Sequence, residues 1–300
     1  MWRDLFCTEM AECEGTLLFK VRIGETVAFT VPIPDGRCIA AAKETCTLDE
    51  TTEEQETGTV SALEIGNLFS VPCFHQALRC LDIYCETKGI DPVFCMVPKE
   101  AMPSLTAYYT AAGREYGVLA ERDWYDYIYI KEDLIGFKGK RFNGQRNHVN
   151  KFRRLYPEAV FRRLNRENID RVKDFCLDYN HRFGKDTDTA REDEEKTLEV
   201  LDNFELYDQI GGYMEYQGKV IGVSIGEVMG DTLVVHIEKA DIDYEGIYPA
   251  LVQEFSAMFA APASIRFINR EDDAGDEGLR RSKLSYHPVA LLEKYTVSVY

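Results

Sequence analysis

The sequence predicts a mixed α/β protein made of two consecutive domains. Three observations lead to this fold class. The chain of 300 residues has room for two medium-sized domains, and its 45% hydrophobic content can supply their cores. Strand-like runs alternate with helix-like periodic segments along both halves. In the second half, a strand, a helix and another strand follow one another, an order that implies a parallel crossover.

The first half is predicted to open with a hairpin. Two alternating segments, 16–23 and 26–33, meet near Gly24-Glu25. Residues 44–59 are rich in Thr and Glu, which predicts an exposed loop. Further along, the patterns predict a helix at 74–88, a strand at 92–97, a helix at 99–112 and a pair of strands within 116–130.

The second of these paired strands carries alternating tyrosines. Tyr125, Tyr127 and Tyr129 project to one face, which we interpret as packing against a neighbouring domain. A platform on which bases stack is the other interpretation.

The second half begins with a basic helical segment, 137–156, which ends before Pro157. The elements predicted after it are a strand at 159–164, a helix at 169–183, an acidic stretch at 186–195 that leads into a helix with Leu198, Leu201 and Leu206, strands at 212–216, 220–228 and 232–240, a helix at 249–260, a strand at 265–269, a helix at 276–284 and a strand at 292–299. Their order resembles that of the GNAT acyltransferase superfamily, and the first half has a weaker version of it. We therefore expect two tandem GNAT-like domains, 1–136 and 159–300, joined by a basic helical connector, 137–158.

The composition argues for a cytoplasmic protein. No run approaches the roughly 18 apolar residues of a membrane span, and no apolar stretch follows Arg3 as it would in a signal peptide. Eight of the nine cysteines precede residue 96, and none forms a Cys-x-x-Cys pair. Free thiols in a reducing compartment are expected, and no metal site is.

Polar side chains end both strands of the predicted crossover. The first strand carries His236 and Glu238, and the second is followed by Asn269, Glu271 and Asp273. Because parallel strands place their carboxyl ends at one edge of the sheet, we expect these side chains to converge on one crevice. The simpler explanation is that strand ends are polar because loops are solvated.

Such a crevice would suit acyl transfer to an amine. The reaction needs a base, for which Glu238 and His236 are the candidates, and oxyanion donors. The donors would be Asn269 and Arg270, while Glu271 and Asp273 would hold an ammonium group. Arg280 and Lys283, three residues apart on a helix, are expected to reach across to these carboxylates. For Asp276 and Glu277, the helix dipole is the better explanation.

The charge is unevenly distributed. The chain carries −17 overall, yet residues 138–166 hold ten Lys or Arg against the single acid Glu158, a local net charge of +9. Such a segment can attract phosphates, and tRNA is the expected partner. Its candidate contacts are Lys140, Arg146, Lys151, Arg153 and Arg154. Neutralisation of nearby acids explains the pattern equally well.

Coenzyme A is disfavoured as a donor. GNAT enzymes hold its pyrophosphate on a glycine-rich turn after the fourth strand. The corresponding stretch here, 241–248, has three acids and only Gly246.

Spaced motifs over residues 60–300 resemble the phosphatidylglycerol lysyltransferase C-terminal-like family of unknown function. The first set is Asp126-Tyr-Ile-Tyr129, Asp133-Leu134, Gly139-Lys140, Arg146-Asn147-His148 and Phe152. The second is His236-Ile-Glu-Lys-Ala240, Asn269-Arg-Glu-Asp272, Gly278-Leu279-Arg280, Lys283 and Ser285-Tyr286.

The resemblance implies two GNAT-like domains and kinship with Fem-type transferases, which take aminoacyl groups from tRNA. It adds Tyr286 to the expected substrate-binding residues. Gln145 departs from the pattern, since a base is expected there, and the membrane-spanning half of lipid lysyltransferases has no counterpart in this sequence.

The sequence thus predicts an acyl or aminoacyl transferase. Its donor would be aminoacyl-tRNA or, failing that, acyl-CoA, and its acceptor a small polar amine or hydroxyl compound. The alternatives are a noncatalytic ligand- or RNA-binding protein on the same scaffold, and a CoA-dependent N-acetyltransferase with a degenerate motif.

Overall fold

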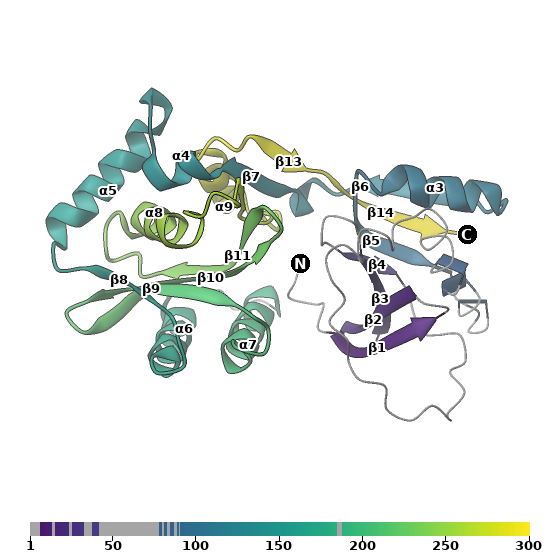
Figure 1. Cartoon of the computed structure of the whole chain (residues 1–300), viewed down its shortest axis with the longest axis horizontal. Coiled ribbons are helices and arrows are strands. Elements are labelled where there is room, and N and C mark those ends of the chain that lie inside the picture. The colour runs from purple at the N-terminus through teal and green to yellow at the C-terminus, as the bar shows by residue number, and fades with distance from the viewer. Residues whose placement is uncertain are drawn as a thin grey trace. The chain divides into compact units, whose positions relative to one another are not determined.

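The chain forms two compact units, each with one seven-stranded sheet (Figure 1). The computed structural model describes three parts of the chain. They are residues 91–300 without 185–187, seven further positions between 78 and 89, and the backbone alone of four strands between 7 and 41. One unit comprises Met1–Tyr125 and Leu292–Tyr300, and the other comprises Asp126–Leu291. The predicted connector, 137–158, lies within the second unit.

The sheet of the first unit is antiparallel throughout. Its strands run in the order β1-β2-β3-β4-β5-β14-β6. Their bounds are β1 (Cys7–Cys13), β2 (Thr16–Ile23), β3 (Thr26–Pro32), β4 (Cys38–Ala41), β5 (Val93–Pro98), β6 (Tyr116–Ala120) and β14 (Lys294–Val299). The predicted hairpin is confirmed by β2 and β3. The predicted loop at 44–59 and most of the helix at 74–88 lie outside the described residues.

Helix α3 (Met102–Ala111) packs on this sheet. It buries Leu105 and Tyr109 in a core shared with Phe94 on β5 and with Val297 and Val299 on β14. The 3-10 turn η2 (Arg122–Trp124) follows β6 and is the last element before the chain enters the second unit at Asp126.

Two strands lie in sheets other than those predicted. Strand β14 was expected to complete the C-terminal domain, but it pairs with β5 and β6 in the first sheet. Strand β7 (Asp126–Ile130) was expected in the first domain, but it pairs with β12 in the second sheet. An alternating pattern identifies a strand without identifying its partners, so the exchange of strands was not visible in the sequence.

The second unit has helices on both faces of its sheet. The strand order is β13-β7-β12-β11-β10-β9-β8. The remaining strands are β8 (Val160–Arg163), β9 (Ile210–Tyr216), β10 (Lys219–Met229), β11 (Thr232–Ala240), β12 (Phe267–Asn269) and β13 (Ala290–Leu292). The helices are α4 (Lys131–Gly136), α5 (Asn143–Leu155), α6 (Ile169–Phe183), α7 (Asp188–Asp202), α8 (Ile247–Phe259) and α9 (Glu277–Leu284), with the 3-10 turn η3 (Lys140–Phe142) before α5.

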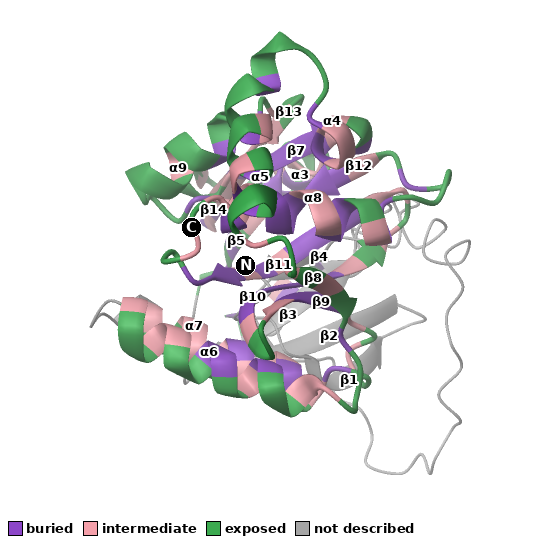
Figure 2. Cartoon of the chain, turned by 90° about the vertical axis from the view of Figure 1, so that its left-hand side faces the viewer, coloured by how far each residue is buried: buried purple, intermediate pink, exposed green. Residues whose placement is uncertain are grey.

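The sheet of the second unit separates two cores. Helix α8 packs on one face, with α4 and α5 against it, while α6 and α7 cover the other (Figures 1 and 2). On the α8 side, Val252 and Phe255 pack with Leu233 of β11. On the α6–α7 side, Phe175 and Leu201 form a separate core. The predicted α/β architecture, with sheets flanked by helices, is therefore present.

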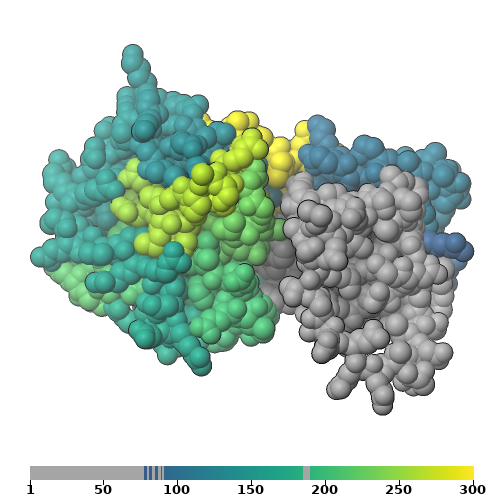
Figure 3. Space-filling model, in the orientation of Figure 1, coloured from purple at the N-terminus to yellow at the C-terminus, as the bar shows by residue number. Residues whose placement is uncertain are grey.

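Segments far apart in the sequence close this unit. Strand β12 pairs with β11 on one side and with β7, about 140 positions earlier, on the other. In the space-filling view, teal and lime-to-yellow segments share one face of the unit (Figure 3). The early segment 126–155 is therefore part of the fold that carries the predicted crevice, and not a linker to it.

Candidate functional site

The predicted crossover is present and its two strands separate at the expected place. Strands β11 and β12 are parallel, and their register runs from Thr232 opposite Phe267 to Val234 opposite Asn269. Strand β11 then continues to Ala240, whereas β12 ends. The chain from residue 270 onward therefore diverges from the end of β11, and the predicted site residues lie along this separation.

A β-bulge in β11 sets the direction of these side chains. Ile225 of β10 faces Ile237 and the next residue, Gly226, faces Val235, so His236 is the extra residue. The bulge reverses the alternation: Val235 joins the core with α8, and Ile237 joins the core with α6 and α7. Gly226 is required opposite the bulge, because a Cβ there would lie 1.9 Å from the carbonyl oxygen of Val234.

His236 is held between two carboxylates. Its Nδ1 is 2.8 Å from Glu271 Oε1, and its Nε2 is 3.1 Å from Glu227 Oε1. Burial alone would lower the pKa of His236, but Glu271 and Glu227 outweigh burial and raise that pKa to about 9. The imidazole is thus a cation at neutral pH. Both ring nitrogens contact carboxylates, and the role of base that the sequence predicts for His236 stays a prediction.

Glu238 forms an ion pair with Arg270. Nη2 of Arg270 donates to Glu238 Oε1 at 2.6 Å, and the guanidinium lies over the ring of Tyr286, 4.7 Å from its centroid. Although burial opposes it, Glu238 raises the pKa of Arg270 above its usual value. The guanidinium therefore remains charged inside the fold.

Asp273 is occupied by a second cation. Arg280 donates from Nη2 at 2.6 Å and from Nε at 2.9 Å, and the hydroxyl of Tyr127 donates at 2.5 Å. Burial works against ionisation, but the bonds from Arg280 and Tyr127 lower the pKa of Asp273 to about 2. Arg280 thus reaches a carboxylate as expected. Asp273 and Glu271 each already bind a cation of the chain, and the ammonium contact predicted for them stays a prediction.

Asn269 and Lys283 shape the loop after β12. The Asn269 amide donates to Asp126 at 3.1 Å and accepts from the backbone N–H of Glu271 at 2.7 Å. Lys283 donates to the carbonyl oxygens of Arg270, at 2.5 Å, and Asp272, rather than to carboxylates. Burial, and then the charge of Arg270, lower the pKa of Lys283 to about 8.

The predicted residues therefore meet, but as neighbouring ion pairs instead of the walls of one open pocket. Strongly perturbed groups gathered at one place are typical of functional sites, and also of structural ion-pair networks. Glu227, Asp126 and Tyr127 were not among the site residues predicted from the sequence, although the motif Asp126-Tyr-Ile-Tyr129 contains two of them. The tyrosine alternation was a signal for Tyr127, which is buried in the second unit. Asp276 caps α9 by accepting from Leu279, which agrees with the helix-end interpretation.

Some cations of the basic segment are bound within the fold. Arg146 donates to the carbonyl oxygens of Phe137 and Gly139, Lys151 pairs with Glu245, and Arg153 pairs with Glu254 of α8 at 2.8 Å. Within the described part of the chain, no ion pair or side-chain hydrogen bond involves Lys140 or Arg154. The phosphate contacts predicted for this segment stay a prediction.

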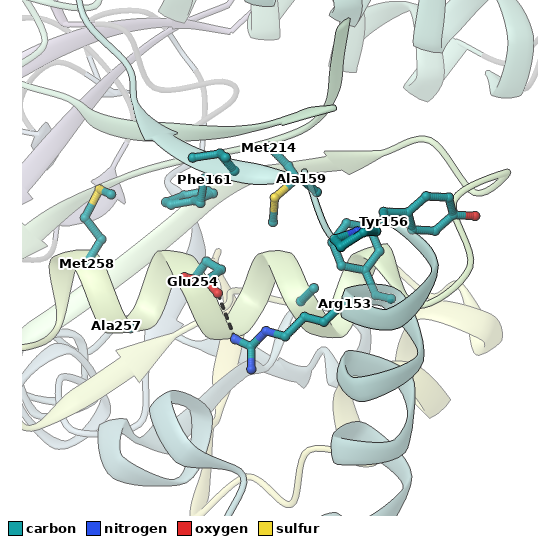
Figure 4. Close-up of a pocket in the computed structure, with 12 residues that line it drawn as sticks. Arg153, Tyr156, Ala159, Phe161, Met214, Glu254, Ala257 and Met258 are labelled. Carbon is teal, nitrogen blue, oxygen red and sulfur yellow. Dashed lines mark hydrogen bonds and ion pairs between the residues drawn. The ribbon is translucent and has the colours of Figure 1, made fainter. Parts of the chain in front are cut away.

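Two cavities lie elsewhere in the second unit, on either side of the edge strand β8. One, of about 510 Å³, is mainly apolar: Phe161, Met214 and Met258 line it, and the Arg153–Glu254 ion pair borders it (Figure 4). The other, of about 560 Å³, is polar and includes Arg162 and Arg171, both of which pair with Glu215. Neither cavity is lined by the predicted crevice residues.

The described residues offer no cluster of three or more His, Cys, Asp or Glu side chains arranged to hold a metal ion. Nor does any helix among them combine the length and apolarity needed to cross a bilayer.

Known proteins resemble the chain in sequence and in fold. A protein of unknown function from Bacteroides thetaiotaomicron is 26% identical, with a TM-score of 0.78 over 100% of this chain and 88% of that one. L-PGS from Bacillus licheniformis shares the fold at 15% identity, with a TM-score of 0.57 over 90% of this chain and 83% of that one. FemX shares it at 10% identity, with a TM-score of 0.55 over 96% and 86%.

An uncharacterised protein of Mycoplasmoides gallisepticum is 24% identical over 179 residues, which span 58% of this chain and only 56% of that protein. The family model described as phosphatidylglycerol lysyltransferase, C-terminal, matches residues 61–298. The chain therefore shares the fold of L-PGS and of FemX. The chain belongs to the phosphatidylglycerol lysyltransferase C-terminal family.

Proposed function

We propose that this protein transfers an aminoacyl group from aminoacyl-tRNA to a hydroxyl or amine of an acceptor molecule. The observation that carries the proposal is the buried Glu238–Arg270 pair at the point where β11 and β12 separate. A charged pair is costly to bury, and this one lies where open α/β sheets bind ligands. The family name, a lysyltransferase, supports the same class of reaction.

Glu238 is the group best placed to act as the base. Arg270 binds its Oε1, and no hydrogen bond from the described residues reaches its Oε2. This second oxygen can accept the proton that the acceptor loses as it attacks the ester carbonyl. His236 cannot do so at neutral pH because it is already protonated.

The turn between β11 and α8 is unsuited to coenzyme A. The backbone amide of Asp243 donates to the side chain of Asp241, and the amide of Tyr244 donates to the Asp241 carbonyl oxygen. Arg182 pairs with both Asp241 and Asp243. Gly246 packs against the carbonyl oxygen of His148, which a Cβ would approach to 2.3 Å. The amides of Asp243 and Tyr244 are thus occupied, and the carboxylates would repel a pyrophosphate.

One observation favours a noncatalytic binding protein as the second candidate. Glu227, Glu238, Glu271 and Asp273 all bind cations of the chain, as in a network kept for structure alone. Only the first candidate, the transferase, predicts that the protein turns over an acyl donor.

The first experiment measures transfer from charged tRNAs and from acyl-CoAs to hydroxyl and amine acceptors. Replacing Glu238 by Gln keeps an acceptor for Arg270 but removes the base, so we expect kcat to fall about 10²- to 10⁴-fold. Glu227→Gln is the matched control, because Glu227 belongs to the same cluster and contacts only His236 among the site residues. Equal loss in both variants, or transfer from acyl-CoA alone, would contradict the proposal.

The second experiment concerns the tRNA donor. Arg154 has no acidic partner among the described residues, whereas its neighbour Arg153 is paired with Glu254. We expect Arg154→Gln to weaken tRNA binding about twofold to tenfold and to reduce its salt dependence, while Arg153→Gln has a smaller effect. Filter binding at several salt concentrations provides the measurement. Wild-type protein that fails to bind tRNA at low salt would rule out this donor.

A further inference from the structure

Two buried donors beside Glu238 lack a hydrogen-bond partner among the described residues. They are Nη1 of Arg270 and Oγ of Ser224. Arg270 donates to Glu238 only from Nη2, so the Nη1 group of its guanidinium stays unpaired within the described part of the chain. Ser224 lies directly opposite Glu238 in the β10–β11 ladder. Opposed residues of an antiparallel pair project to one face with Cβ atoms about 5 Å apart, so both donors flank the same carboxylate.

Ser224 faces the α8 side of the sheet. Its neighbours Val223 and Ile225 belong to the core with α6 and α7, which directs Ser224 to the opposite face. Gly222, two residues earlier, confirms the direction, because a Cβ there would lie 3.5 Å from Leu251 of α8. Arg270 stacks on Tyr286, which belongs to the core on this same side.

The free donors require an oxygen that the folded chain does not supply. Ser224 is fully buried and Arg270 is 8% exposed, so bulk water does not satisfy either group. Folded proteins leave few buried donors unpaired, because an unpaired donor loses the bonds that water would give it. Glu238, which the two donors flank, keeps 14% of its side-chain surface exposed.

The surrounding charges favour a neutral oxygen over a permanent anion. Arg270, Arg280 and His236 are each paired with carboxylates, and Lys283 is engaged by two backbone carbonyls. A bound carboxylate or phosphate would therefore add a negative charge with no cation reserved for it. A carbonyl oxygen that becomes negative only during a reaction avoids this cost.

We infer that Arg270 Nη1 and Ser224 Oγ bind the carbonyl oxygen of the transferred acyl group and stabilise it as an oxyanion. This assignment rests on the proposed aminoacyl transfer. The acceptor oxygen or nitrogen attacks the ester carbon, the carbonyl π electrons move to oxygen, and the two donors bind that oxygen. When the carbonyl re-forms, the ester C–O bond breaks and the ribose oxygen leaves. Glu238 accepts the acceptor's proton and returns it to that leaving oxygen.

The kinetic test replaces Ser224 by Ala. Removing an oxyanion donor should lower kcat about 10- to 100-fold with little change in KM for charged tRNA, because the bond strengthens only in the transition state. Ser256→Ala is the matched control: Ser256 is equally buried, lies on α8, and is not among the buried groups without partners. A Ser224→Ala enzyme as fast as wild type would overturn the assignment.

A second readout does not depend on turnover. A panel of amino-acid amides, with a neutral carbonyl, and the matching free amino acids are titrated calorimetrically into each protein. We expect an amide to bind wild type and the Ser256→Ala variant, and to bind Ser224→Ala about tenfold more weakly. The melting temperature of Ser224→Ala without ligand should equal or exceed that of wild type, since an unpaired hydroxyl has been removed.

The outcomes separate the two proposals. If wild type transfers nothing but binds an amide through Ser224, the proposed function fails and the carbonyl site stands. If no amide binds, or if Ser224→Ala binds it unchanged, the carbonyl site fails whatever the transfer assay shows. A lowered melting temperature of Ser224→Ala with unchanged amide binding would mean that the hydroxyl holds a buried water only.

Discussion

His236 shows how two neighbours can reverse the chemistry of a side chain. A histidine at a strand end suggests a base, but here two carboxylates flank the ring and stabilise its cation. The sequence identifies His236 and Glu271 as residues near one edge of the sheet. It does not identify Glu227, which lies on another strand and joins them only through the β10–β11 register.

The charge of His236 predicts a specific pH dependence of stability. The pKa of His236 is about 9 in the fold against 6.5 for an ordinary histidine side chain. Its contribution to the free energy of unfolding is therefore complete below pH 6.5 and disappears as the pH rises through 9. The difference corresponds to about 3 kcal/mol. Between pH 6.5 and 9.5, the free energy of unfolding should fall further for wild type than for His236→Gln.

Chemical denaturation at several pH values measures this difference. Lys283 contributes with the opposite sign, because its folded pKa of about 8 lies below the usual 10.5, and its contribution cancels when the variant is compared with wild type. His181→Gln, at an exposed position on α6, is the control and should follow wild type. Identical slopes for wild type and His236→Gln would show that the imidazole is neutral.

At the scale of elements, the bulge in β11 is the feature that the sequence could not reveal. The run from Val234 to Glu238 predicts a strand, a prediction that the structure confirms. Regular alternation would place Val235 and Ile237 on the same face, yet they belong to different cores. The residue that indicates the bulge is Gly226 on the partner strand, which has no side chain. Gly226 can be interpreted in this way only once the β10–β11 register is known.

Replacing Gly226 by Ala tests the bulge. A Cβ 1.9 Å from the Val234 carbonyl oxygen would force the strands apart, and we expect a loss of roughly 3 kcal/mol in stability together with loss of any transfer activity. Gly144→Ala is the control, because a Cβ there meets nothing within 4 Å and Gly144 lies in helix α5. That variant should be slightly more stable than wild type. Equal melting temperatures for Gly226→Ala and wild type would contradict the described register.

At the scale of the whole molecule, the strand exchange separates what local patterns predict from what they miss. The α/β class, the crossover and the meeting of polar strand ends follow from periodicity and connectivity. The partners of β7 and β14 do not, because pairings across more than a hundred residues leave no local trace. For the same reason, the sequence placed the domain boundary at 136/137, whereas the compact units divide at 125/126.

Deleting residues 294–300 tests the dependence of the first unit on β14. The deletion removes the strand between β5 and β6 and the core residues Val297 and Val299. We expect amides of β5 and β6 to exchange rapidly with solvent, while amides of β10 and β11 keep their protection. Hydrogen–deuterium exchange with mass spectrometry distinguishes the two sheets. Protection of β5 and β6 that matches the intact chain would show that the strand is dispensable.

The position of β14 also orders events during synthesis. Strands β5 and β6 leave the ribosome early, but the strand that joins them is translated after the whole of the second unit. Tyr295 and its partner Ala120 are separated by 175 positions, so no local hairpin can stand in for this pairing. The unit encoded first is therefore the one completed last, and until then the edges of β5 and β6 are open to chaperones and to other nascent chains.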